Sequence, residues 1–113
     1  MKVKNNKFFT SPSDLNNFIA CKYTALNEIK FHNKEIKKSD DKVNDELWKK
    51  MGIDHEKKHY KLLKDKYKKN ITIKSDLNEN DRFNETVSAI QKGYDFIYHA
   101  YLVDENFRGE ADF

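Results

Sequence analysis

The spacing of apolar and polar positions predicts helices in the first part of the chain and strands in the last part. From Ser11 to about Phe31, apolar residues recur at the spacing of a helix, and they are Leu15, Phe18, Ile19, Leu26 and Ile29. The helix has a strong start, because Ser11 can cap it and Pro12 suits its first position. Asp14 stands where a capping box needs an acid. We therefore predict a helix over this span, followed by a polar loop over residues 32–42.

A second and longer helix is predicted from about Val43 to Lys68. At about 100° per residue, one set of its residues shares a face: Trp48, Met51, Gly52, His55, His59, Leu62 and Leu63. A stripe of lysines lies on the opposite face: Lys50, Lys57, Lys61, Lys64 and Lys68. Both histidines are therefore expected to point with the tryptophan and leucines toward a core or a cleft.

The rest of the chain predicts a short helix between strands. Residues 71–74 read as a short strand, and the spacing of Phe83, Val87 and Ile90 predicts a third helix that ends with Gly93 in a left-handed conformation. Residues 95–103 alternate as a strand, with one face made of Phe96, Tyr98, Ala100 and Leu102. Residues 104–106 form a turn, and residues 107–113 form a last strand.

This order predicts an α/β (α+β) fold in which N-terminal helices pack on an incomplete mixed sheet. The shared apolar face of the long helix and the alternation of the strand predict which side chains are buried: Trp48, Leu62, Phe96 and Ile97.

Composition narrows the class of protein only modestly. At 113 residues the chain has room for one domain or part of one, and 37% apolar residues against 36% charged residues predict a modest core. A net charge of +3 does not by itself indicate nucleic acid as a partner. The single cysteine, Cys21, excludes an internal disulfide. With no signal peptide and no apolar run of the ~20 residues that a membrane helix needs, we expect a cytoplasmic protein.

Several motifs together resemble one family. Ser11-Pro12-Ser13-Asp14-Leu15, with Phe18 and Cys21, is similar to the opening helix of RecB-like nucleases of the PD-(D/E)XK superfamily. Gly52-x-x-His55-Glu56 resembles the histidine motif of that family. Gly93-Tyr94-Asp95-Phe96-Ile97-Tyr98 and Gly109-x-x-Asp112-Phe113 resemble the two strands that lead to its first metal-binding aspartate. The resemblance covers nearly the whole chain and is nearest to the bacterial branch that carries a ribonuclease-H-like region further on.

The resemblance implies a metal-dependent nuclease with a restriction-endonuclease-like core. Asp112 would be the central ligand of Mg²⁺ or Mn²⁺, and His55 would be a further ligand, so both would be catalytic. The acid and the lysine of the next strand have no counterpart in this sequence. We therefore expect residues 1–113 to be the N-terminal part of one nuclease domain, cut after Asp112 and inactive alone, whose complete form cleaves DNA, including single-stranded ends.

Each of these residues also has a purely structural interpretation. Asp112 can be a solvated aspartate at a strand end, and His55 can be a hydrogen-bonded core histidine. The family gives His59 no role. The lysine stripe suits a solvated helix face, and its position opposite His55 argues against its lining the substrate channel of the same site.

Two other functions remain open from the sequence. His55-Glu56-Lys57-Lys58-His59 matches the H-E-x-x-H helix of zinc metallopeptidases, with Glu56 as general base and Glu85 as a distant third ligand. The two lysines between Glu56 and His59 differ from the uncharged residues of such helices. The chain can also be a non-catalytic remnant of the nuclease fold.

Cys21 has two interpretations as well. Some RecB-like relatives bind an iron–sulfur cluster through one N-terminal cysteine and three near the C-terminus. The three further cysteines are not in these 113 residues, so no cluster is expected here. We therefore expect Cys21 to be buried as a small apolar side chain.

Overall fold

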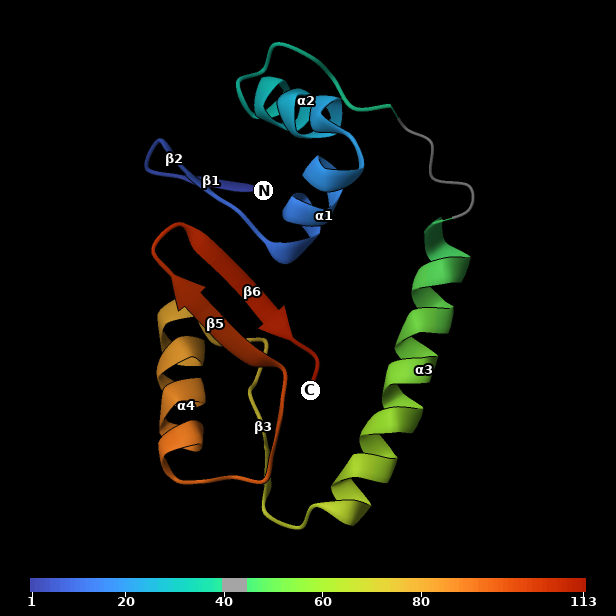
Figure 1. Cartoon of the computed structure of the whole chain (residues 1–113), viewed down its shortest axis with the longest axis vertical. Helices are drawn as coiled ribbons and strands as arrows, with labels where there is room; N and C mark the ends of the chain where they lie inside the picture. Colours follow the sequence, from blue (N-terminus) through green and yellow to red (C-terminus); the bar gives the residue numbers. More distant parts are fainter. Residues whose placement is uncertain (40–44) are drawn as a thin grey trace. The chain divides into compact units, whose positions relative to one another are not determined.

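The computed structural model describes residues 1–39 and 45–113, which form a mixed α+β fold (Figure 1). The coarse class predicted from the sequence is confirmed. In chain order the described elements are β1 (Lys2–Lys4), β2 (Lys7–Phe9), α1 (Pro12–Ala20), α2 (Lys22–His32), α3 (Asp45–Lys66), β3 (Asn70–Thr72), α4 (Glu79–Gln91), β4 (Phe96–Tyr98), β5 (Ala100–Asp104) and β6 (Phe107–Ala111). Their strands pair as three two-stranded sheets, β1 with β2, β3 with β4, and β5 with β6.

The chain divides into two compact units. The first contains Met1–Asp40 together with Val103–Gly109, and the second contains Asp41–Leu102 together with Glu110–Phe113. Within the residues that the structure describes, no helix is both long and apolar enough to cross a membrane.

The first unit opens with a hairpin that the sequence analysis did not predict. Strands β1 and β2 are antiparallel, with Val3 opposite Phe8. Asn5 and Asn6 form the turn, with φ angles of 51° and 58°. A two-residue turn with both φ values positive suits the right-handed twist of a hairpin, and asparagine tolerates this conformation. In the sequence, the Asn5-Asn6 pair between two short segments was the signal that could have predicted this hairpin turn.

The predicted first helix is two helices, which corrects the single span expected up to Phe31. The capping box is present: the Ser11 hydroxyl accepts from the Asp14 N–H, and the Asp14 carboxylate accepts from the Ser11 N–H at 2.8 Å. The break falls at Cys21, whose backbone is extended (φ −158°, ψ 112°). Its N–H donates to the carbonyl of Asn17 and closes α1, and its carbonyl accepts from Thr24 at the start of α2.

Cys21 itself is exposed, so the expectation of a buried cysteine was wrong. It serves as the junction of two helices, where its backbone groups are used and its side chain faces outward.

The turn end of the β5–β6 hairpin completes the first unit. The Thr10 N–H donates to the carbonyl of Asn106, and the Arg108 N–H donates to the carbonyl of Thr10, each at 2.9 Å. The guanidinium of Arg108 lies 4.1 Å from the centre of the Phe9 ring. Gly109 lies so near Pro12 that a Cβ added to this glycine would be 2.9 Å from the proline Cδ. The glycine is therefore required here by a close approach between segments distant in sequence.

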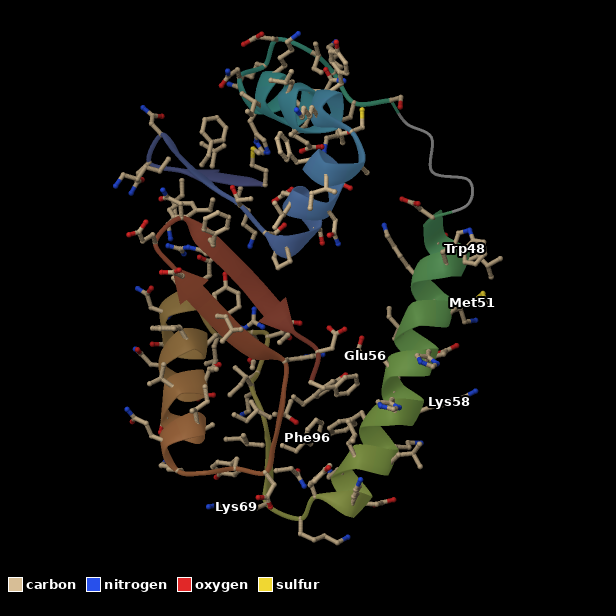
Figure 2. The ribbon with its side chains drawn as sticks, in the orientation of Figure 1. Trp48, Met51, Glu56, Lys58, Lys69 and Phe96 are labelled. Carbon is tan, nitrogen blue, oxygen red and sulfur yellow. The ribbon has the colours of Figure 1, made fainter. Side chains whose placement is uncertain are left out.

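In the second unit, α3 turns a different face inward from the one predicted. Trp48 is 68% exposed and Leu62 is 67% exposed, so the prediction that both are buried was wrong. The half-buried residues are Glu56, Tyr60, Leu63 and Tyr67. They recur at i, i+4, i+7 and i+11 and so form one helical face. Figure 2 shows Trp48 and Met51 pointing away from the strands and Glu56 pointing toward them. The predicted start near Val43 lies outside the described residues.

The inward face of α3 has a physical explanation. Its two tyrosines and one leucine offer large apolar areas to the strands while each tyrosine keeps a polar end for hydrogen bonding. The Tyr60 ring stacks on Tyr98 of β4 with 4.3 Å between ring centroids. Ring stacking with the strands, rather than the summed hydropathy of Trp48, Met51 and Leu62, decides the rotation of the helix.

Strands β3 and β4 are parallel neighbours, with Ile71 opposite Ile97, and α4 connects them. Asn78 caps the start of α4 by accepting from the Asp81 N–H. At the end, the Gly93 N–H donates to Ile90 and the Tyr94 N–H to Ala89, while Gly93 has a φ of 64°. This pair of bonds is a Schellman motif, so the predicted glycine termination of the helix is confirmed.

The core of the second unit lies in this β–α–β part. Its buried apolar residues are Ile73, Ala89 and Phe96, together with Tyr101 of the next strand, β5. Phe96 is buried as predicted, and Ile97 is half-buried. Thr86 joins α4 to β5, because its hydroxyl donates to the Arg82 carbonyl and accepts from the Tyr101 N–H. In Figure 1 strand β3 lies between α3 and α4.

The strand predicted over residues 95–103 is interrupted at His99, which has a φ of 59° and separates β4 from β5. The short strand predicted near Ile71 is present as β3, and the turn predicted before the last strand is centred on Glu105, with a φ of 47°.

Candidate functional site

The candidate site is built around Glu56, the polar residue on the inward face of α3. Its Oε1 atom accepts a hydrogen bond from the Tyr98 hydroxyl of β4. The same Oε1 atom lies 2.9 Å from Nε2 of His99. An ionised carboxylate can only accept, so the hydrogen of the imidazole is on Nε2 in this arrangement. Both bonds end on one oxygen, and Oε2 is the atom of Glu56 left to meet a ligand.

His99 joins the helix to the last segment of the chain. Its ring stacks on Tyr98 with 3.8 Å between ring centroids, and its Nδ1 lies 3.9 Å from Oε1 of Glu110. Its backbone N–H donates to the carbonyl of Asp112 at 3.2 Å. The imidazole and the peptide group of one residue therefore reach Glu56 on one side and the Glu110–Asp112 segment on the other.

The backbone of His99 is strained. Of the described non-glycine residues with positive φ, Asn5, Asn6 and Glu105 lie in hairpin turns and Lys34 follows the end of α2. His99 instead lies between two strands. A left-handed conformation costs roughly 1–2 kcal/mol for a residue with a Cβ, and such strain gathers at functional sites. The hydrogen bonds to Glu56 and Asp112 hold His99 in this conformation.

Glu110 is itself fixed by a cation. It forms an ion pair with Arg82 of α4, whose guanidinium lies 4.6 Å from the centre of the Tyr101 ring. The Arg82 side chain is only 11% exposed, so this pair is screened less than a surface pair. Glu110, the acid nearest Asp112 in the sequence, is therefore held by Arg82 of α4 and lies near His99.

Aromatic rings pack around Tyr98, the hydrogen-bond donor to Glu56. Tyr98 stacks on both Tyr60 and Phe96, and Phe113 stacks on Phe96 and Tyr98 with ring centroids 5.9 and 5.6 Å apart. His59 meets Phe113 edge-on at 5.4 Å. These ring contacts help to fix the position of the Tyr98 hydroxyl that donates to Glu56.

The hydrogen bonds shift the titration of both partners. The Tyr98 hydroxyl, and after it His99, hold the pKa of the Glu56 carboxyl below its ordinary value. Partial burial, and then the hydrogen bond to the Glu56 carboxylate, raise the pKa of Tyr98 to about 12. The negative charge of Asp112 adds to the rise in the pKa of Tyr98. Glu56 is therefore an ionised acceptor near neutral pH.

The two residues predicted to bind metal occupy different surroundings. Asp112 follows β6 and is exposed, and its carbonyl is bonded to His99. His55 is exposed on α3, and its ring stacks on His59 with 6.3 Å between ring centroids. In the part of the chain that the structure describes, no group of three or more His, Cys, Asp or Glu residues is placed to hold a metal ion. The shared metal of His55 and Asp112 stays a prediction.

The residues of the H-E-x-x-H pattern, like the two predicted metal ligands, lie in different surroundings. The His55 ring stacks on His59, and His59 in turn meets Phe113, whereas Glu56 is bonded to Tyr98 and His99. The third ligand suggested by the sequence, Glu85, is exposed on α4.

Sequence reasoning did not assign Tyr98 and His99 to the site. A signal for the helix was present, because Glu56, Tyr60, Leu63 and Tyr67 have perfect helical spacing. Nothing in the sequence marks the break at His99, since histidine and its neighbours fit the alternation of a continuous strand.

A scan against protein-family models, a search of curated proteins and a search of solved structures each find no match to this chain. The class that fold and site define is a mixed α+β protein in which a carboxylate on a helix is bonded to a histidine between two strands.

Proposed function

We propose that residues 1–113 are the N-terminal portion of a RecB-like, metal-dependent nuclease of the PD-(D/E)XK superfamily that hydrolyses phosphodiester bonds in DNA. One observation carries the proposal: His99 is bonded both to the carboxylate of Glu56 and to the backbone of Asp112. The carboxylate of the helix residue Glu56 and the backbone of the strand-end residue Asp112 therefore meet at one residue, His99. The motifs around Gly52, Gly93 and Gly109 support the same family, and its restriction-endonuclease-like core is part of the proposal.

The residues suit a hard divalent cation. Asp112 and Oε2 of Glu56 offer carboxylate oxygens, which Mg²⁺ and Mn²⁺ prefer. When bound, such an ion polarises a phosphoryl oxygen and lowers the pKa of an attacking water. His99 and Tyr98 hold Oε1 of Glu56 and so orient its other oxygen, as hydrogen-bond partners of metal ligands commonly do. In the complete protein, an acid and a lysine on the next strand would supply the rest of the site.

For the helix contribution we favour Glu56 over His55. Glu56 points toward the strands in Figure 2, whereas the His55 ring is exposed and stacked on His59. The Mn²⁺ affinity of imidazole still makes His55 a testable ligand. We further propose a cytoplasmic protein, since the single Cys21 suits a reducing compartment.

The test uses residues 1–113 and a protein extended with the missing acid and lysine, each incubated with end-labelled single-stranded DNA in Mn²⁺ or Mg²⁺. We expect cleavage only by the extended protein, because one or two carboxylates do not orient the water. Asp112→Asn and Glu56→Gln should each lower the rate at least about 100-fold while the far-ultraviolet circular dichroism stays unchanged.

His55→Ala separates the two assignments of the helix ligand. An unchanged rate in this variant supports Glu56, and a loss equal to that of Glu56→Gln supports His55. Cleavage by residues 1–113 alone would refute the half-site proposal. Zinc-dependent peptidase activity that Glu56→Gln abolishes would establish the metallopeptidase, and a folded extended protein without either activity would indicate a non-catalytic remnant.

A further inference from the structure

The inward position of Glu56 changes the meaning of the lysine stripe on α3. Seen from His55, these lysines lie on the opposite face. In an ideal helix, however, Lys64 and Lys57 lie about 80° and 100° around the axis from Glu56, and Lys61 lies about 140° from it. All three are exposed. Lys57 and Lys64 therefore flank the face that carries Glu56 and Tyr60, and Lys61 lies between them along the helix, further from that face.

Two observations connect this row of lysines with the candidate site. The Lys64 ammonium lies 5.7 Å from the centre of the Tyr60 ring, and Tyr60 stacks on Tyr98, the hydrogen-bond donor to Glu56. Lys57 follows Glu56 directly in the sequence. The row thus begins beside the carboxylate and continues for about 10 Å along the helix at 1.5 Å per residue.

We infer that Lys57, Lys61 and Lys64 bind the phosphates of a single strand of nucleic acid and lead it to Glu56. A single straight row of cations complements one phosphate backbone. Partly exposed rings on the other side of Glu56, Phe113 and His59, offer stacking surfaces to bases that a duplex would conceal. This inference rests on the proposed function for the identity of the site, but the binding needs no metal.

The row does not suit a membrane surface. An interfacial helix places large apolar residues between its lysines. Here the exposed apolar side chains Trp48 and Met51 project from another side of α3, as Figure 2 shows. The residue that lies between the row and Glu56 is Tyr60, which is half-buried against Tyr98.

The test measures fluorescence anisotropy of a labelled 20-nucleotide oligo-dT with the 113-residue chain, without metal, between 50 and 200 mM salt. Replacing Lys57, Lys61 and Lys64 by glutamine should make the slope of log affinity against log salt shallower by about 2, since each phosphate contact on a single strand contributes about 0.7. Replacing Lys22, Lys30 and Lys37 of the first unit removes the same charge and should leave the slope unchanged.

A matched pair of neighbours refines the test. Lys57→Gln should weaken binding several-fold, whereas Lys58→Gln should not, because Lys58 points away from the strands (Figure 2). Equal losses in the two triple variants, equal affinity for a duplex of the same length, or no binding would each overturn the inference. Binding to phosphatidylserine vesicles in place of oligo-dT would also overturn it. Strand binding without nuclease activity in the extended protein would uphold the inference and reject the proposed function.

Discussion

At the scale of single residues, the hydrogen bond from Tyr98 to Glu56 links stability to pH. Tyr98→Phe removes the donor, and we expect it to lower the free energy of unfolding at pH 7 by about 1 kcal/mol, at the low end for a bond to a charged group because the site is partly exposed. The Glu56 pKa is lowered on folding, so this stabilisation is present above its unfolded value of about 4.3 and is lost as pH falls through the lowered pKa. Urea denaturation at pH 7 and at about pH 2.5 should therefore show the difference only at the higher pH.

At alkaline pH, the contribution of this hydrogen bond to stability decreases as the pH rises. The Tyr98 pKa is raised to about 12, so its contribution is complete below the unfolded value of about 10 and is lost as pH rises toward 12. Absorbance at 295 nm should show one late-titrating tyrosine that Tyr98→Phe removes. Tyr23→Phe, at a tyrosine that is 74% exposed, is the control and should leave the late step in place.

His99 allows a test of backbone strain. Because its φ is positive, His99→Gly should be more stable than His99→Ala by about 1 kcal/mol, although both lose the imidazole. At Ser88, inside α4, the order should reverse by a similar amount, because glycine is a poor helix former. Thermal or urea denaturation of the four variants gives the comparison. An alanine variant at position 99 as stable as the glycine variant would mean that residue 99 does not keep the left-handed conformation.

At the scale of elements, two glycines should respond to alanine in opposite directions. Gly109→Ala would place a Cβ 2.9 Å from the Pro12 ring, so α1 or β6 must shift, and we expect a loss of about 1–3 kcal/mol. Gly52→Ala in α3 meets nothing within 4 Å and should gain about 0.5–1 kcal/mol from helix propensity. Urea denaturation measures both, and a gain at Gly109 would show that Pro12 does not approach it closely.

The rotation of α3 is the element-level fact with most consequence for function. Summed hydropathy favours a face with Trp48, Met51 and Leu62, whereas the structure buries part of Glu56, Tyr60 and Leu63 instead. Tyrosines can stack on strand residues and still satisfy their hydroxyls, which a hydropathy pattern does not represent. The same rotation brings Glu56 to the strands and the lysine row to the edge of the site.

At the scale of the whole molecule, burial is uneven between the two units. Among the described residues, the buried apolar ones, Ile73, Ala89, Phe96 and Tyr101, all belong to the second unit. Within their described spans, α1, α2 and α3 contain no fully buried residue. The first unit is instead held by backbone and polar contacts, such as the N-terminal amine of Met1 on Asp14 at 2.7 Å and the bonds between Thr10 and β6.

The sequence by itself determined features that depend on neighbours along the chain. The capping box of Ser11 and Asp14, the glycine termination at Gly93, the mixed α+β class and the burial of Phe96 are all local or periodic properties, and all are confirmed. Caps and left-handed glycines act within one helical turn, so a few consecutive residues specify them.

Only the tertiary structure decided which face of α3 meets the strands and where the long strand breaks. Both depend on contacts between residues more than forty positions apart, Glu56 with Tyr98 and His99. The strain at His99 is tolerated because those bonds, and the bond to Asp112, offset its cost, and no local pattern announces them. The candidate site is therefore a property of the fold, while its helices and turns are properties of the sequence.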